Sequence, residues 1–415
     1  MLVELHVVVL AVLGSVTTYL LILSILAALA SLKSSFATDT QRKFAIVVPA
    51  HNEELSIGKT IKSLLEIEYP RKLYDVITIA DNCTDRTADI AREAGGMVFE
   101  RQDNKHRGKG FALRWCFEKL NKASADYSGI VVIDADSTAS KNFLSVMNYY
   151  LEQGAKVIQS ADLVAPQPGA WSSEATRLGF FLYNYVRPLG RKVIGLSAGL
   201  RGNGMCFTMD ILRDVPWEAY SLNEDLEYGL LQLIKGNPTV FAPEAVVLAT
   251  MPSNPVNAQS QRARWEGGRL PLLRKFVPHL LKEAVKQRRL SLIDALIDLV
   301  IPALVNILVV ALLMAIVTLL LGALGFSGIY WFSLGWILVF LIGISHLIVG
   351  IAASGDADLW RLLKHVPRYV IWKLALYLKL VSKGRITEWV RTTREPEGPV
   401  PGQQEKDVES RAGLG

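Results

Sequence analysis

The chain has 415 residues, of which 51% are hydrophobic and 20% are charged, and its formal net charge is +6. A mean hydropathy of +0.27 is high for a soluble globular protein and predicts membrane-spanning segments beside a water-soluble domain. The mild basic excess is typical of a cytoplasmic membrane face, and we expect no nucleic-acid partner. Cys83, Cys116 and Cys206 have no metal-binding spacing, fit a reducing compartment and predict no disulfide.

The first apolar segment covers residues 5–32, and no charged residue occurs between Glu4 and Lys33. It exceeds the roughly 20 residues that cross a bilayer, so it predicts a transmembrane helix. A cleaved signal peptide is the alternative, but such peptides usually start with basic residues and this chain starts with Glu4. We expect a retained membrane anchor.

Strands and helices alternate after this anchor. Short apolar strands that alternate with helices predict an open, mainly parallel α/β sheet. Ligands of such sheets bind beyond the carboxyl ends of the strands. The expected strands cover residues 44–50, 76–80, 96–100 and 129–136, and the expected helices cover residues 55–67, 87–95 and 108–120.

Polar side chains follow three of these strands. Because the carboxyl ends of parallel strands meet at one edge of a sheet, we expect these side chains to form a single site. They are His51, Asn52 and Glu53 after the first strand, Asp81, Asn82 and Asp85 after the second, and Asp134 and Asp136 after the fourth.

Asp134 and Asp136 are two carboxylates separated by one residue where a strand ends. A strand projects such a pair to one side, and carboxylate oxygens suit Mg²⁺ or Mn²⁺. A divalent ion held by few carboxylates usually completes its shell with substrate phosphates. An ordinary surface loop is the alternative, because this string of three residues is short and common.

Glu224 and Asp225 open an amphipathic helix rich in leucine. Acids are favoured in a first helical turn for dipole reasons, so capping by Asn223 with neighbouring acids is one interpretation. The functional interpretation makes Asp225 a general base for an acceptor hydroxyl. The glycines of GLRGNGMCF, at residues 199–207, would let the backbone pass close to a ligand.

Lys109 lies between two glycines in NKHRGKG, at the expected start of a helix. A lysine with backbone amides can hold a diphosphate. The segment lacks the spacing and the final Ser or Thr of a Walker A motif, and the GNG of residues 202–204 does not open a helix after the first strand. These differences argue against an ATPase and against a dehydrogenase.

The sequence QRARWEGGR, at residues 261–269, precedes the C-terminal apolar region. Trp and Arg favour membrane interfaces, so Arg262 and Arg269 could simply face lipid headgroups. Arg264 offers a planar, permanently charged group for a diphosphate. Trp265 offers an apolar face for a sugar ring or a lipid headgroup. We expect this segment to lie where a water-soluble donor meets a membrane acceptor.

Residues 269–290 mix basic and apolar positions at helical spacing, which predicts an amphipathic helix on the membrane surface or one packed on the protein. The charge-free residues that follow predict two transmembrane helices, at 299–324 and 329–353, with a turn at GFSG. Residues 357–393 are expected to be interfacial, and the polar residues 394–415 to be disordered.

Basic residues follow the first and the last of the three expected spans, and the positive-inside rule then places residues 33–290 and the C-terminal tail in the cytoplasm. We therefore expect a multi-pass protein of the cell membrane with the lipid bilayer as a partner. The expected spans carry no Asp, Glu, Lys or Arg, which argues against a transporter. The basic residues are Lys33, Arg42 and Lys43 after the first span and Arg361, Lys364 and Arg368 after the last.

With these residues assembled, the chain resembles membrane-embedded family 2 glycosyltransferases of the GT-A fold, the group of cellulose, chitin and hyaluronan synthases and ceramide glucosyltransferases. The resemblance covers roughly residues 43–290 and the membrane arrangement. It rests on the order of VPAHNEE with ADNCTDRT, then DAD, NED and QRARW, the last of which matches the Q-x-x-R-W signature of the membrane group. It implies a Rossmann-like GT-A domain at residues 43–268 and inverting transfer from a nucleotide sugar, most often a UDP-sugar.

The resemblance also implies roles for individual residues. It implies a nucleoside pocket formed by Pro49, Ala50, Glu53 and Asp81, with Lys109 near the phosphates and Asp134 near the ribose and phosphates. It implies Asp136 as a ligand of Mg²⁺ or Mn²⁺ and Asp225 as the base, with Glu224 beside it. It implies Gln261, Arg264 and Trp265 at the border between the diphosphate and a lipid or glycan acceptor.

Some features depart from the large synthases of this group. The acidic motif is NED where many have TED, only two spans follow the catalytic domain, and no gating-loop motif follows QRARW. These departures favour single transfer onto a lipid-linked or membrane acceptor over a processive polysaccharide synthase that forms a pore by homo-oligomerisation. A non-catalytic membrane scaffold is a remoter alternative, because the acids and cations that decay would remove first are present.

Overall fold

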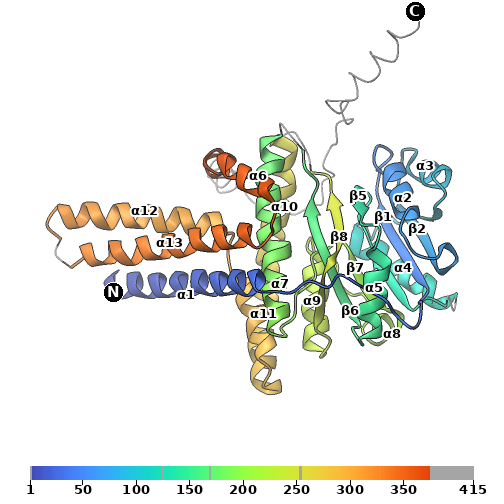
Figure 1. Ribbon diagram of the computed structural model, residues 1–415, viewed down its shortest axis with the longest axis horizontal. Coiled ribbons are helices and arrows are strands. Elements are labelled where there is room, and N and C mark those ends of the chain that lie inside the picture. The colour runs from blue at the N-terminus through green and yellow to red at the C-terminus, as the bar shows by residue number, and fades with distance from the viewer. Residues whose placement is uncertain (1, 124–125, 168–169, 252–254, 327, 374–415) are drawn as a thin grey trace, which may run out of the picture.

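The computed structural model describes residues 2–123, 126–167, 170–251, 255–326 and 328–373. An α/β domain forms one end of the molecule and three long helices form the other (Figure 1). These helices are α1 (Leu2–Ala28), α12 (Leu304–Ala323) and α13 (Tyr330–Ala352), and each is long and apolar enough to cross a membrane. The predicted combination of an α/β domain with three apolar helices is confirmed.

The described strands form one eight-stranded sheet with the order β3-β2-β1-β4-β7-β6-β8-β5. All four strand positions expected from the sequence are strands, although the fourth is shorter than expected. The strands are β1 (Phe44–Ala50), β2 (Tyr74–Asp81), β3 (Met97–Arg101), β4 (Gly129–Val132), β5 (Ser137–Ala139), β6 (Val157–Val164), β7 (Met205–Thr208) and β8 (Thr239–Ala249).

Four of the seven pairs among the described strands are parallel, including β6 with β8, so the sheet is mainly parallel as expected, but only by a small margin. Strands β3, β2, β1 and β4 are parallel, as the alternation of strands and helices predicts. Strand β7 lies antiparallel to both β4 and β6, and β5 lies antiparallel to β8. The reason is the connection: β7 follows a helical excursion toward the apolar helices and returns from it in the opposite direction. The sheet is therefore mixed.

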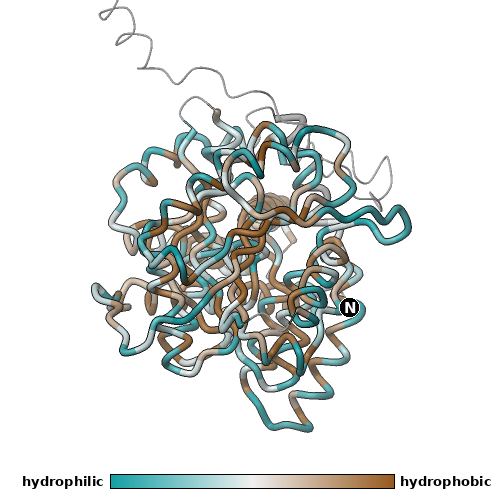
Figure 2. Tube along the Cα trace, turned by 90° about the vertical axis from the view of Figure 1, so that its right-hand side faces the viewer, coloured by the Kyte–Doolittle hydropathy of each residue, from teal (hydrophilic) through white to brown (hydrophobic). Residues whose placement is uncertain are grey.

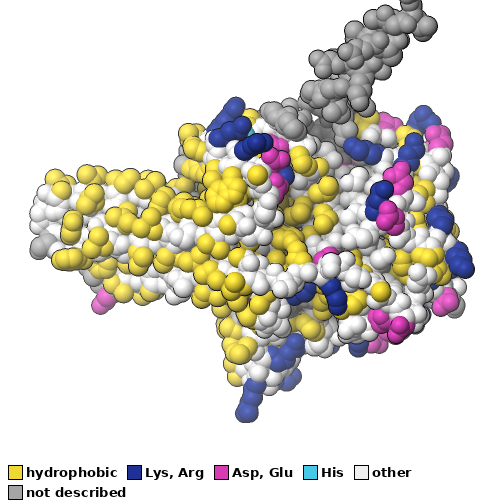
Figure 3. Space-filling model, viewed as in Figure 1, with side chains coloured by type: hydrophobic (Ala, Val, Ile, Leu, Met, Phe, Trp, Pro, Cys, Tyr) yellow, Lys and Arg dark blue, Asp and Glu magenta, His cyan; other side chains and the backbone are white. Residues whose placement is uncertain are grey.

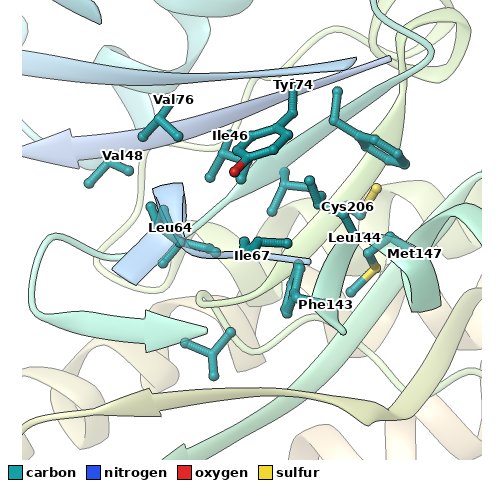
Figure 4. Close-up of a cluster of buried hydrophobic side chains, with 14 of the residues drawn as sticks. Ile46, Val48, Leu64, Ile67, Tyr74, Val76, Phe143, Leu144, Met147 and Cys206 are labelled. Atoms are coloured by element: carbon teal, nitrogen blue, oxygen red, sulfur yellow. The ribbon is translucent and has the colours of Figure 1, made fainter. Parts of the chain in front are cut away.

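The central strands are buried on both faces, so their side chains supply two cores. Ile46 and Val48 point to the core that Figure 4 shows, where they meet helices α2 (Ile57–Leu65) and α5 (Phe143–Glu152). Ala45 and Val47 point to the opposite core, beneath α4 (Lys109–Lys122). In Figure 2 these apolar strands run through the middle of the domain, with hydrophilic loops around them. The remaining helical elements of the domain are η1 (Arg71–Leu73), α3 (Thr87–Glu93), α8 (Met209–Asp214) and α9 (Glu224–Ile234).

One helical excursion joins the α/β domain to the apolar helices. It leaves β6 and consists of α6 (Trp171–Phe180), the π-helical segment η2 (Phe181–Val186) and α7 (Arg187–Val193). Leu182, Val186 and Leu189 of this excursion pack with Leu347 and Ile351 of α13. Segments α14 (Ala357–Arg361) and η3 (Leu362–His365) join the same core. This connection was not predicted from the sequence.

Two further helices, α10 (Pro255–Gln287) and α11 (Leu290–Val300), run across the direction of α1, α12 and α13 in Figure 1. The predicted amphipathic segment 269–290 is the C-terminal part of α10 and the turn into α11. One face of α10, with Leu272, Phe276 and Leu280, packs against α9 and α11. Another face exposes Leu281 and Val285, which are 49% and 80% exposed. The segment therefore packs on the protein and also presents apolar and basic side chains outward.

On the face that Figure 3 shows, most coloured side chains of the three-helix bundle are hydrophobic. Helix α13 packs against both α1 and α12, and Trp336 of α13 donates a hydrogen bond to His6 of α1 at 2.6 Å. The N-terminal end of α1 and the turn between α12 and α13 lie at the same end of the bundle, away from the α/β domain (Figure 1). The domain and residues 357–373 therefore lie at the other end.

Candidate active site

A cavity of about 1400 Å³ begins at the carboxyl ends of β1, β2 and β4 and continues to α12 and α13. Eleven of the twelve site residues expected from the sequence line it. They are Pro49, Ala50, Glu53, Asp81, Lys109, Asp134, Asp136, Glu224, Asp225, Gln261 and Trp265. The twelfth, Arg264, belongs to α10, but its side chain is outside the described part of the structure.

Asp81 closes the end of the cavity formed by β1 and β2. Arg101 donates to its carboxylate at 2.6 Å, and the Asn82 amide donates to the same oxygen at 3.1 Å. Burial raises the pKa of the Asp81 carboxyl, and the contact with Arg101 offsets only part of that rise. Beside it, the imidazole Nδ1 of His51 lies 2.7 Å from the Asp81 carbonyl oxygen. The carboxylate is thus held in one orientation at the cavity wall.

Lys109 is the first residue of α4 and ties three parts of the cavity together. Its ammonium donates to Asp134 at 2.6 Å and to the carbonyl of Gly202 at 2.7 Å, and it lies 3.8 Å from Glu224. Burial alone would lower the pKa of Lys109, but the neighbouring carboxylates outweigh it and the pKa is raised. The side chain is therefore a permanent cation beside a helix N-terminus, an arrangement that favours anions.

Asp134 and Asp136 lie in the turn between β4 and β5, because β4 ends at Val132. The expectation that both project from one strand is therefore wrong, although both reach the cavity. Among the described residues no group of three His, Cys, Asp or Glu side chains is arranged to hold a metal ion. One or two carboxylates in an anion-binding cavity still fit a divalent ion that takes its other ligands from substrate phosphates and water.

Asp162 of β6 is a cavity residue that the sequence analysis missed. Its two carboxylate oxygens accept from the amides of Asn184 and Asn203 at 3.0 and 3.2 Å. Burial, reinforced by Asp134, raises the pKa of Asp162 well above its usual range. Asn203 also accepts from the backbone N–H of Asp134 at 3.0 Å, so this network positions the DAD turn. The available signal was one acid within an otherwise apolar strand.

Glu224 and Asp225 occupy the first turn of α9, where both are partly buried and line the cavity. Burial raises the pKa of Glu224 to about 7, with Lys109 opposing and Asp225 adding to the rise. Burial also raises the pKa of Asp225, against its backbone hydrogen bond and the nearby cations. Gly202 has a φ of +88°, and a Cβ there would lie 3.1 Å from Oδ2 of Asp225. A carboxylate with a raised pKa that faces a cavity can accept a proton.

The start of α10 brings Gln261 and Trp265 to the same cavity. The carbonyl of Trp265 accepts from the Asn223 amide at 3.2 Å, next to the acids of α9. The Trp265 ring contacts Phe180 of α6, with ring centroids 5.5 Å apart. Arg269 does not face lipid headgroups as considered from the sequence: it donates to the carbonyls of Asp298 and Leu299 and ties α10 to α11.

Comparison with known proteins gives a family match over most of the α/β domain. The sequence profile of the family described as "Glycosyltransferase like family 2" matches residues 41–268. The probable glycosyltransferase YdaM of Bacillus subtilis is 27% identical over 263 residues, which are 60% of this chain and 60% of that protein. Poly-beta-1,6-N-acetyl-D-glucosamine synthase of Staphylococcus epidermidis is 24% identical over 60% of this chain and 58% of its own length. The match thus spans less than two thirds of the length of either relative.

Among solved structures, the mannosyltransferase PcManGT of Pyrobaculum calidifontis, in complex with GDP-Man and Mn²⁺, aligns with a TM-score of 0.49 and 15% identity. That alignment covers 81% of this chain and 99% of the mannosyltransferase. The S. aureus protein TarS, residues 1–349 in complex with UDP-GlcNAc, aligns with a TM-score of 0.37 and 18% identity over 50% of this chain and 58% of its own.

Proposed function

Because this chain belongs to the glycosyltransferase-like family 2, we propose that it is a membrane enzyme that transfers a sugar from a nucleotide diphosphate sugar to a hydroxyl group of a lipid or lipid-linked acceptor. The family match supports the GT-A type of α/β domain expected from the sequence. The observation that carries the proposed acceptor is the cavity, because Lys109 and the acids line one end and the apolar helices α12 and α13 line the other.

The donor is assigned to the end of the cavity beneath β1, β2 and β4. In this proposal Pro49, Ala50, Glu53 and Asp81 contact the nucleoside, and Asp134 contacts the ribose and the phosphates. Lys109 neutralises the diphosphate. Its fixed position between Asp134 and the Gly202 carbonyl supports this role. A UDP-sugar is the donor that the resemblance favours.

Asp136 is the proposed ligand of Mg²⁺ or Mn²⁺. When bound, the ion would neutralise the negative charge that develops on the departing diphosphate. The chain itself holds the Asp136 side chain through Ser137, whose hydroxyl donates to Oδ1 at 3.1 Å. Asn203, which also contacts Asp162, fixes Asp134 of the same turn by accepting from its backbone N–H.

Asp225 is the proposed general base. The O–H bond of the acceptor breaks, its proton passes to the Asp225 carboxylate, and the freed oxygen bonds to the anomeric carbon of the sugar. The bond between that carbon and the diphosphate oxygen breaks at the same time, so the configuration inverts. Glu224 helps to hold Lys109, while Gln261, Arg264 and Trp265 border the diphosphate and the acceptor.

The membrane placement follows from the same arrangement. We assign α1, α12 and α13 to the bilayer, and residues 33–290 to the cytoplasm, where nucleotide sugars are made. Helices α10 and α11 cross the bundle direction, and basic side chains gather at one tip of this pair in Figure 3. They would lie along the membrane surface, as an amphipathic helix does.

Replacing Gly202 by alanine tests the position of Asp225. The added Cβ would press on the Asp225 carboxylate at 3.1 Å, and we expect transfer to fall by about 10²-fold, because small misplacements of a catalytic group carry that cost. The matched control is Gly195→Ala, since Gly195 has a similar φ of +72° and an added Cβ there meets nothing within 4 Å. Equal rates for the two variants would contradict the placement of Asp225.

The function itself is tested by offering purified protein a panel of nucleotide sugars together with a native lipid extract. We expect a lipid that carries a single added sugar, detected by mass spectrometry. A ladder of products would instead identify a processive polysaccharide synthase, an alternative that similarity to a polysaccharide synthase supports. Failure to consume any donor would contradict both and favour a non-catalytic scaffold.

A further inference from the structure

The membrane end of the cavity is lined by aliphatic and aromatic side chains. From α12 and α13 these include Leu304, Leu308, Val309, Phe340 and Ile344. Neither helix contains Asp, Glu, Lys or Arg among its described residues, and His346 is the one titratable side chain that they contribute to the lining. This end therefore matches hydrocarbon chains in shape and polarity.

A cluster of buried charges lies where the apolar end meets the α/β domain. It contains three guanidinium groups, from Arg187, Arg191 and Arg201, and two carboxylates, from Asp294 and Asp298. All five side chains are at most 9% exposed. Three positive charges against two negative charges leave one excess positive charge. Buried charges are normally paired, and Asp225 supplies a further carboxylate near Arg201, whereas Asp298 is the carboxylate that acts on Arg187.

Arg187 is the least compensated member of this cluster. Its Nη1 lies 3.6 Å from Asp298, whereas Nη1 of Arg191 lies 2.8 Å from the same carboxylate. Within the described residues, neither Nε nor Nη1 of Arg187 has a hydrogen-bond partner. Burial lowers the pKa of the Arg187 guanidinium, although the nearby Asp298 opposes that shift. Arg187 also lines the cavity, so its hydrogen-bond donors without a partner lie at the cavity wall.

A second buried polar atom without a hydrogen-bond partner among the described residues comes from α13. His346 of α13 is fully buried and lines the cavity. Its Nδ1 lies 2.6 Å from the Ser24 hydroxyl of α1, and its Nε2 has no partner among the described residues. Lys373, which is 3% exposed, adds a further positive group to the same lining. Nitrogen groups from three separate elements thus face one cavity.

We propose that this junction binds the negatively charged headgroup of the lipid acceptor, with the hydrocarbon chains of that lipid lying along α12 and α13. Charge complementarity selects this occupant, because a planar guanidinium suits a phosphate or carboxylate and the neighbouring lining suits only hydrocarbon. The same cavity contains Asp225, so the bound lipid can present a hydroxyl group to it. The inference rests on the proposed function, and it narrows the acceptor to anionic lipids.

Lipid binding to the full chain in neutral detergent, without any nucleotide sugar, tests this inference by native mass spectrometry. Three probes separate charge from chain: dioleoyl phosphatidylglycerol has both, dioleoylglycerol has the chains and a hydroxyl, and glycerol 3-phosphate has the charge alone. We expect phosphatidylglycerol to bind at least about tenfold more tightly than either other probe, the difference that a charge-assisted hydrogen bond makes.

Variants separate the headgroup site from the chain site. Arg187→Gln should lose the roughly tenfold preference for phosphatidylglycerol, and Arg187→Lys should keep part of it because the charge remains. Leu308→Trp should weaken the binding of both phosphatidylglycerol and dioleoylglycerol, because the larger side chain fills the apolar end of the cavity. The control is Lys286→Gln on α10, whose side chain is 72% exposed and should attract anionic lipid only weakly through the solvent. Retained UDP binding shows that each variant is folded.

Several outcomes would overturn the inference. If dioleoylglycerol binds as tightly as phosphatidylglycerol, there is no headgroup site. If glycerol 3-phosphate binds as tightly as phosphatidylglycerol, the site binds a free anion. If Lys286→Gln loses the preference for phosphatidylglycerol and Arg187→Gln keeps it, the lipid is attracted to basic side chains on the protein surface. If Arg187→Gln does not fold, the other two variants decide. Unchanged lipid binding in both Arg187→Lys and Leu308→Trp would then also overturn the inference. Sugar transfer to a neutral lipid alone would leave the proposed function intact and refute only this inference.

Discussion

Asp225→Asn should reduce sugar transfer by about 10³- to 10⁴-fold, the upper range for removal of a general base. The amide keeps the size of the carboxylate but cannot take the acceptor proton. Lys109 contacts Asp134 and Gly202 rather than Asp225, so the diphosphate site should persist and UDP affinity should change little. Initial rates by mass spectrometry and UDP binding by calorimetry measure the two effects.

Glu224 lies next to Asp225 in the chain, so its variant tests which of the two acids is the base. Glu224→Gln should reduce transfer less than Asp225→Asn, because Glu224 acts through Lys109 at 3.8 Å. Asp210→Asn is the surface control, since Asp210 on α8 is 85% exposed and should leave the rate unchanged. A larger loss in Glu224→Gln than in Asp225→Asn would transfer the role of base to Glu224.

The pH dependence of the wild-type rate follows from the same pair of acids, Glu224 and Asp225. Burial raises the pKa of Glu224 to about 7 and also raises that of Asp225. A base works when deprotonated, so kcat/KM should rise with pH through the neutral range and fall on the acid side. In Glu224→Gln the acid limb should move to lower pH, because Asp225 then loses a neighbouring negative charge. An unchanged limb would indicate that another group titrates.

The sequence predicted which acids lie together, but it did not predict the antiparallel strands of the sheet. Acids at Asp81, Asp134 and Asp136 were expected together because strand ends of an α/β sheet converge, and all three line one cavity. This reasoning needed only the order of strands β1, β2 and β4. It did not depend on whether the rest of the sheet is parallel.

What could not be predicted depends on contacts between distant segments. Strand β7 runs antiparallel because the excursion α6–η2–α7 leaves the sheet to pack on α1 and α13. Nothing in the local pattern of residues 171–193 shows that partner. Likewise, Asp162 and Asn203 are 41 positions apart in the chain, and only the pairing of β6 with β7 brings them within 3.2 Å.

The charged cluster at the membrane junction illustrates the same limit. Asp294 and Asp298 of α11 lie one helical turn apart, so their common face could be seen in the sequence. Their partners Arg187, Arg191 and Arg201 come from the excursion and the following loop. Because long-range packing creates both the pairing and the donors of Arg187 that lack a partner among the described residues, the anionic headgroup site could be inferred only from the structure.

Asp136→Ala should reduce transfer by about 10³-fold, because it removes the proposed ligand of the ion that stabilises the leaving diphosphate. Lys109 and Asp134 remain, so some affinity for UDP should persist without metal. The decisive measurement is UDP binding with and without Mn²⁺: the wild type should bind more tightly with the ion, and Asp136→Ala should not.

Asp89→Ala is the matched control for this prediction. Asp89 lies on α3, is 62% exposed and pairs with Arg92 at 3.3 Å on the surface, so its loss should leave metal-dependent binding and transfer unchanged. If Asp136→Ala kept the full effect of Mn²⁺ on UDP affinity, the metal would have to be held elsewhere. Asp134 would then be the next candidate, because it lies in the same turn and already contacts Lys109 at 2.6 Å. The DAD turn would keep its place in the site, but its two acids would exchange the roles proposed for them.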